Sequence, residues 1–167
     1  MMMLNGTELK ASTVLQAMVE GLLKSKDDPK FTVEMGTFGH VKNQLCYGCA
    51  ATLTLTEMFG DGRPASEIML SYAKTPINPL EYVEARLSDV LPLNPSSTQD
   101  SLPTYELCDL ERAIDDVRTG EVSSLIYFLT GRYDEPFDGR WKLGDENWEE
   151  QIPEIERTIA EMIAAGY

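Results

Sequence analysis

Residues 40–60, HVKNQLCYGCAATLTLTEMFG, decide the fold; they hold two of the three cysteines and begin at the only histidine. No residue from Asn43 to Thr56 carries a charge, although 25% of the chain is charged. So apolar a segment in an acidic chain is expected to be a central buried element. Leucines alternate with threonines at 52–56, as in a strand, but the segment's length and its paired alanines favour a buried helix at about 49–59.

Apolar residues recur at helical spacing on both sides of this segment. We therefore expect helices over about 7–26, from 64, over 78–91, from about 104 to 119, over 122–130 and from about 147. Residues 31–35 alternate apolar and polar, which fits a short strand. The predicted fold class is mainly α, with six or seven helices around the central one. One short strand or hairpin, an α+β minority alternative, is left open.

The chain is expected to form a single domain over residues 1–167. Residues 92–103, PLNPSSTQDSLP, are rich in proline and serine and predict a flexible surface loop. The 64 residues after it would make a thin independent core, so we expect this loop to join two halves of one domain.

Charge is the outstanding feature of the composition. The chain has 28 acidic and 14 basic side chains, a net charge of −14 and a pI near 4.4. This balance repels phosphates and anionic lipid headgroups, so neither nucleic acid nor a membrane surface is an expected partner. It favours a basic protein or cations, or it serves solubility alone.

Targeting signals are not apparent. The first ten residues, MMMLNGTELK, lack a basic stretch followed by an apolar core, so no secretory signal is expected. No window approaches the ~18 apolar residues of a membrane span. Three cysteines are an odd number and too few for a disulfide scaffold, which predicts a reduced, cytoplasmic protein.

Cys46 and Cys49 have the CxxC spacing of disulfide-exchange sites. A cysteine that opens a helix can be held as a thiolate, which makes a redox role one interpretation. The residues before it, Lys42, Asn43 and Gln44, make a poor buried strand, whereas the redox motif needs one. The alternative is two small apolar side chains in the core.

A zinc site is a second interpretation of the same segment. His40, Cys46, Cys49 and Cys108 would supply an imidazole and three sulfurs, a valid tetrahedral set. A zinc knuckle normally pairs two short motifs, however, and here the fourth ligand is a single cysteine beside apolar helix positions. Core packing explains Cys108 without metal, so no metal and no cofactor are predicted.

Residues 41–44, VKNQ, followed by 46–50, CYGCA, resemble the stretch around the nucleophile of papain-type cysteine proteases. On that resemblance, Gln44 would be the oxyanion-hole donor and Cys49 the nucleophile. The spacing between them is one residue short, and Ala50 replaces the family's tryptophan. Because the family needs a downstream histidine as general base and none follows His40, we reject the protease assignment.

The C-terminal third combines aromatic residues with carboxylates. Such a surface suits a basic protein partner, since charge speeds the encounter and aromatic anchors hold the complex. The alternatives are tryptophans that pack the last helix onto the body, and weak calcium binding by the carboxylates. The predicted binding residues are Asp134, Glu135, Phe137, Asp138, Trp141, Asp145, Glu146, Trp148 and Glu149.

The sequence therefore favours a small acidic binding, inhibitory or regulatory protein that engages a basic protein partner, and not an enzyme. The first alternative is a thiol-dependent enzyme or redox protein that uses Cys46, Cys49 and His40, with Gln44 in support. The second is a regulator that binds calcium or zinc. The sequence determines neither the partner nor the oligomeric state.

Overall fold

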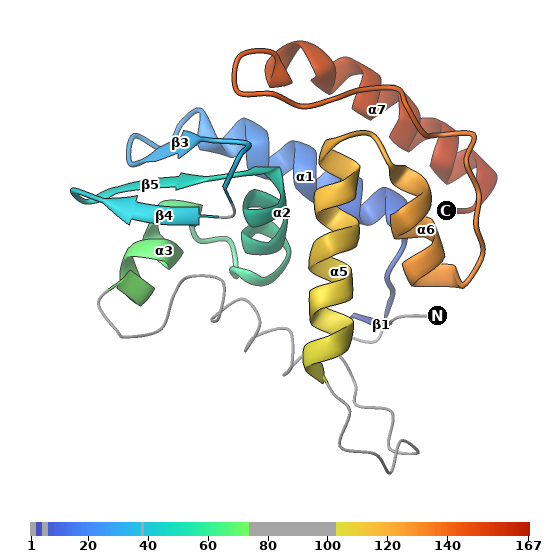
Figure 1. Ribbon diagram of the computed structural model, residues 1–167, viewed down its shortest axis with the longest axis horizontal. Helices are drawn as coiled ribbons and strands as arrows, with labels where there is room; N and C mark the ends of the chain where they lie inside the picture. Colours follow the sequence, from blue (N-terminus) through green and yellow to red (C-terminus); the bar gives the residue numbers. More distant parts are fainter. Residues whose placement is uncertain (1–2, 5–6, 38, 74–102) are drawn as a thin grey trace.

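The computed structural model describes residues 3–4, 7–37, 39–73 and 103–167, with side chains for 8–37, 39–71 and 109–167. Two short paired strands, β1 (Met3–Leu4) and β2 (Thr7–Glu8), precede the first helix. Three more strands lie at one end of the molecule and a group of helices at the other (Figure 1). The helices are α1 (Ala11–Ser25), α2 (Ala50–Phe59), α3 (Ala65–Ala73), α5 (Pro103–Arg118), α6 (Val122–Thr130) and α7 (Trp148–Ala165).

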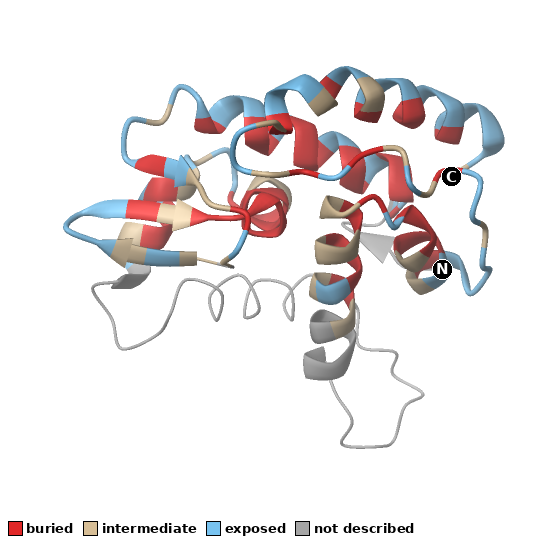
Figure 2. Ribbon diagram, turned by 45° about the horizontal axis from the view of Figure 1, so that its top comes forward, coloured by how far each residue is buried: buried red, intermediate tan, exposed pale blue. Residues whose placement is uncertain are grey.

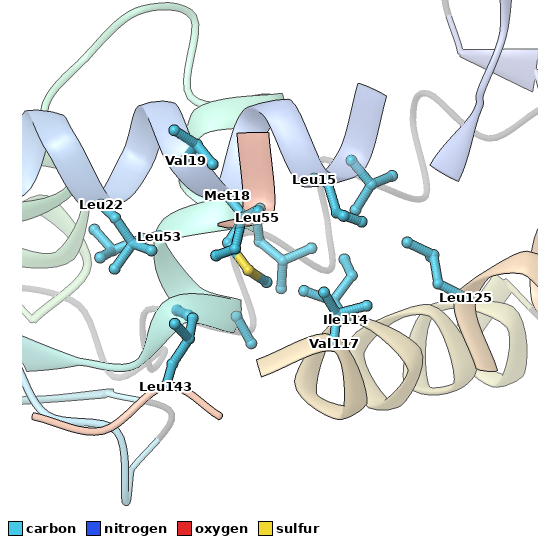
Figure 3. Close-up of a cluster of buried hydrophobic side chains, with 14 of the residues drawn as sticks. Leu15, Met18, Val19, Leu22, Leu53, Leu55, Ile114, Val117, Leu125 and Leu143 are labelled. Carbon is cyan, nitrogen blue, oxygen red and sulfur yellow. The ribbon is translucent and has the colours of Figure 1, made fainter. Parts of the chain in front are cut away.

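The helix predicted at about 49–59 is confirmed as α2, and eight of its ten residues are buried. Its residues from 50 to 56 are all buried, and it packs against α1, α5 and the sheet. Leucines of α1 and α2 face apolar side chains of α5 and α6 in one continuous core (Figure 3). At Gly21 the two helices approach so closely that an added Cβ would lie 2.7 Å from Leu53 O.

The threonines in α2 are buried without loss of hydrogen bonds. Thr54 Oγ1 donates to Ala50 O at 2.7 Å, and Thr56 Oγ1 donates to Leu53 O at 3.1 Å. Threonine hydroxyls in a helix bond to the preceding turn in this way, which satisfies them inside an apolar core. The alternation of leucine and threonine therefore does not require a strand.

The prediction of a mainly α protein is wrong, because residues 31–48 form a three-stranded mixed sheet and the fold is α+β. Its strands are β3 (Phe31–Val33), β4 (Gly39–Lys42) and β5 (Leu45–Gly48), in the order β3-β5-β4. β3 runs parallel to β5 and β4 runs antiparallel to it. The strand expected within 31–35 is confirmed as β3, whereas the hairpin that was left open as an alternative had not been placed at β4 and β5.

The hairpin between β4 and β5 explains the missed strands. Asn43 and Gln44 both have positive φ, 53° and 63°, as in the two-residue turn whose twist matches that of paired strands. Of the three polar residues that seemed unfit for a buried strand, Asn43 and Gln44 form the turn and Lys42 is the last residue of β4. In β5 the inward Cys46 and Gly48 alternate with the more accessible Leu45 and Tyr47, which is the period of a strand with one face buried.

The remaining predicted helices agree with the structure where it describes them. The first starts at Ala11 and not at Thr7, because residues 7–8 pair with β1. Pro153 lies within α7 without ending it. The described part of the chain has six helices. The helix expected at 78–91 and the loop at 92–102 lie outside the described residues, and α5 begins at Pro103.

A long connection, residues 131–147, links α6 to α7 and crosses the end of α5. It donates hydrogen bonds to carbonyl oxygens in the last turn of α5, where the helix itself supplies few donors. Trp141 Nε1 donates to Val117 O at 2.8 Å, and Leu143 N donates to Arg118 O at 2.9 Å. Beyond it, α7 packs its apolar side on α1 and leaves its outer side in solvent (Figure 2). None of the helices in the described ranges has the length and apolarity needed to cross a bilayer.

Candidate functional site

His40 and Cys46 lie on opposite faces of the sheet. His40 is exposed and pairs across the hairpin with Tyr47, and the two rings stack with centroids 4.7 Å apart. Cys46 pairs with Val41 and points to the other face, because side chains alternate along a strand. The Cys46 thiol is buried, with Sγ 3.7 Å from Ser66 O. His40 therefore cannot act as a base toward Cys46.

Cys49 occupies the N-cap position of α2 and is 1% exposed. Its Sγ lies 3.9 Å from Thr52 Oγ1. The residue borders a cavity of about 340 Å³ that Asp115 and Arg118 also line, and the only histidine of the sequence, His40, is not among the lining residues. The Asp115 carboxylate in this cavity accepts from Arg118 Nε at 3.0 Å.

Gln44 lies too far from Cys49 for the role that the protease resemblance implies. It is at the hairpin turn, and the whole of β5 separates it from the cysteine. Five residue steps along an extended strand span roughly 16 Å. A glutamine side chain cannot bridge that distance, so Gln44 is not an oxyanion-hole donor for this thiol.

Both thiols are held protonated. Burial raises the pKa of Cys46, and the nearby Asp28 carboxylate raises it further. Burial also raises the pKa of Cys49, although backbone N–H groups of α2 lower it in part. Reactive cysteines have a lowered pKa and solvent access. Cys46 and Cys49 have neither property, and both are free thiols.

The predicted zinc ligands do not converge where the structure describes them. His40 and Cys46 point away from each other, and the Cys108 side chain lies outside the described residues. Within the described ranges, no three His, Cys, Asp or Glu side chains are grouped closely enough to hold a metal ion. The carboxylates of residues 134–150, considered for calcium, are included in that statement.

The aromatic residues of the predicted binding surface lie in the core. Phe137, Trp141 and Trp148 are 5%, 4% and 7% exposed. Trp141 packs so tightly beside the turn after α5 that a Cβ on Gly120, whose φ is +87°, would lie 2.3 Å from Trp141 O. These rings hold the connection and α7 to the body, and they are not available as surface anchors.

Several predicted carboxylates have structural partners. The Asp138 carboxylate accepts hydrogen bonds from Ser123 N at 2.7 Å and from Ser123 Oγ at 2.5 Å. It therefore pairs a backbone N–H group that has no partner within the first turn of α6. Asp145 Oδ1 accepts from Met35 N at 2.6 Å, and so ties the connection to the end of β3.

The remaining predicted carboxylates are those of Asp134, Glu135, Glu146 and Glu149. The Asp134 carboxylate accepts a hydrogen bond from the Tyr167 hydroxyl, which raises the pKa of Tyr167. Glu149 forms an ion pair with Lys26 at 3.0 Å. Glu135 and Glu146 are exposed. We call residues 134–149, which are most of the connection and the first two residues of α7, the acidic connection. Its hydrogen bonds hold α5, α6 and the end of β3 together.

A second aromatic and acidic region lies between α5 and α6, in a cavity of about 630 Å³. Tyr127 and Tyr133 line it and are 57% and 65% exposed, and their rings meet edge to face with centroids 6.3 Å apart. The half-buried Phe128 lies in the same lining. We call this cavity the tyrosine groove, defined by Asp109, Arg112, Asp116, Tyr127, Phe128 and Tyr133.

Sequence reasoning missed the tyrosine groove. The sequence predicted the helices at about 104–119 and 122–130, but it did not bring Asp109 and Asp116 together with Tyr127. The available signal was the position of Tyr127 between Ile126 and Leu129, off the apolar side of α6. An aromatic residue on the solvent side of an amphipathic helix is a candidate interface residue.

A larger cavity, of about 670 Å³, lies between the ends of α1 and α2 and the start of α3. The Lys24–Glu57 ion pair, at 2.5 Å, borders it. Asp28 also borders it and accepts from Ser66 Oγ at 2.7 Å and from Ser66 N at 3.2 Å. The charged groups named here already have partners within the chain, so they stabilise the packing of these elements.

No known protein family has a model that matches this chain, and neither the curated proteins nor the solved structures contain a match.

Proposed function

We propose that this chain is a small acidic binding protein, inhibitory or regulatory, that engages a basic protein partner. The observation that supports this most is the net charge of −14 on 167 residues. A negative field of this size accelerates the approach of a cationic protein and repels nucleic acids and anionic lipids.

The carboxylates are displayed on outward faces. Helix α7 carries five glutamates and one arginine over its 18 residues, and its outer side is exposed (Figure 2). Glu149, Glu154 and Glu161 form ion pairs with basic side chains of the chain itself. Exposed pairs of this kind contribute little, so an incoming cation can compete for them.

The thiol alternative has less support than the binding role. Cys46 and Cys49 are buried, their pKa values are raised, and His40 faces away from Cys46. Metal regulation lacks a grouped ligand set within the described residues. A cytoplasmic location is part of the proposal, because free, buried thiols suit a reducing compartment.

The test has two steps. The immobilised protein captures proteins from a lysate of its source, mass spectrometry identifies them, and the best candidate is then purified. Its dissociation constant is measured between about 50 and 500 mM NaCl, a range over which exposed charges become strongly screened. The proposal expects a basic protein whose affinity falls steeply with salt. An acidic partner, or an affinity that salt leaves unchanged, would overturn it.

A further inference from the structure

The tyrosine groove contains two large aromatic side chains that the fold leaves in solvent. Tyr127 projects from α6, and Tyr133 follows three residues after that helix ends. More than half of each side chain is accessible, at 57% and 65%. Single exposed hydrophobic residues are ordinary on protein surfaces. A pair in ring contact beside a cavity of about 630 Å³ is a preformed aromatic surface.

Carboxylates from α5 line the same cavity. Asp109 and Asp116 lie seven positions apart, which is two helical turns and therefore one side of the helix. Within the described ranges, no ion pair engages either carboxylate. Arg112 is the one basic residue among those lining the groove, so the local balance is negative.

We infer that the tyrosine groove is the docking site for an arginine side chain on a basic protein partner. This inference rests on the proposed function and specifies where on the surface the basic partner binds. A guanidinium is planar and weakly hydrated, so it stacks on an aromatic face more readily than an ammonium group does. The two tyrosines supply such faces and the aspartates supply acceptors. The −14 charge of the whole chain favours a cationic occupant over an anionic or neutral one.

Octa-arginine is the probe, with octa-citrulline as its neutral, nearly isosteric control. Binding is measured by titration of the ¹⁵N-labelled full chain at low salt. We expect saturable shifts centred on Tyr127, Tyr133 and the adjoining turn of α5. Octa-citrulline should cause no comparable shifts. Equal binding of the two peptides would overturn the inference, because the groove would then recognise something other than charge.

Tyrosine variants separate ring stacking from bulk. The double variant Tyr127→Leu/Tyr133→Leu keeps apolar volume but removes the rings, and we expect its affinity for octa-arginine to fall about tenfold, the loss of two modest cation–π contacts. Tyr127→Phe/Tyr133→Phe should retain binding within about twofold. A leucine variant that binds like the original chain would overturn the inference. The dispersion of its amide spectrum serves as the check that it is folded.

Charge variants separate the contribution of the groove carboxylates to octa-arginine affinity from that of the overall negative charge. Asp109→Asn/Asp116→Asn should weaken binding by about tenfold, whereas the matched control Glu146→Gln/Glu156→Gln, with the same change in net charge, should weaken it by about twofold. Arg112→Gln should strengthen binding, because it removes a competing cation. Equal losses in the two double variants would place recognition elsewhere and leave the proposed function standing. If octa-arginine does not bind at low salt, both proposals fail.

Discussion

The acidic connection and the tyrosine groove contain the same kinds of residue in opposite surroundings. In the connection, Trp141 and Trp148 are buried, and Asp138 accepts hydrogen bonds from the start of α6. In the groove, Tyr127 and Tyr133 are more than half exposed. Composition alone made the connection look like an interface. The difference teaches that an aromatic residue among carboxylates is an anchor for a partner only where the fold leaves it in solvent.

The largest expected difference between the two regions is the loss of stability when an aromatic residue in each is replaced by alanine. Trp141→Ala removes a buried ring and its hydrogen bond to Val117 O, so we expect a loss of about 3–5 kcal/mol in the free energy of unfolding. Tyr133→Ala, at an exposed position, should cost less than about 0.5 kcal/mol. Urea denaturation measures both. Equal costs would contradict the distinction between the regions.

Two carboxylates within the acidic connection give a smaller contrast. Asp138→Asn weakens the acceptor for Ser123 N and Oγ, and we expect a loss of about 1–2 kcal/mol. The exposed Glu135 provides the matched control, since Glu135→Gln makes the same change of charge and should alter stability by less than about 0.5 kcal/mol. Chemical denaturation under identical conditions compares the variants. If Asp138→Asn left the free energy of unfolding unchanged, the connection would not hold α6.

The cysteines should give the smallest effect, a dependence of stability on alkaline pH. Burial raises the pKa of Cys46 and Cys49 in the folded state above the ordinary value of 9.0. As pH rises through that value the unfolded chain loses these protons first, so stability present at lower pH declines toward the higher folded pKa. Unfolding free energies between about pH 7 and 10 should fall more steeply than in Cys46→Ala/Cys49→Ala. An identical pH dependence would show that the thiols are accessible.

The helices were the predictable part of the fold because each carries an apolar side at helical spacing. The central helix was predicted correctly, since its length outweighed the alternating threonines, whose hydroxyls bond to the preceding turn. The β4–β5 hairpin was missed because Asn43 and Gln44 were judged as candidate strand residues, which they fit poorly, and were not considered as a turn. A turn with two residues at positive φ usually carries glycine, and neither residue here is glycine.

The candidate sites were less predictable because each depends on contacts distant in sequence. The CxxC segment looked reactive, but only pairing across the hairpin shows that His40 faces away from Cys46. Trp141 bonds to Val117, which lies 24 residues earlier, and no local pattern reports that contact. The tyrosine groove joins α5 to the end of α6, so its aspartates and its tyrosines come together only when those helices pack.

The most direct test compares the two regions in one spectrum. The protein has two tryptophans, Trp141 and Trp148, so their indole N–H signals report on the acidic connection, while the amides of Tyr127 and Tyr133 report on the groove. On titration with octa-arginine at low salt, the account predicts that the tyrosine amides shift to saturation while both indole signals stay in place. Shifted indole signals with unmoved tyrosine amides would contradict it.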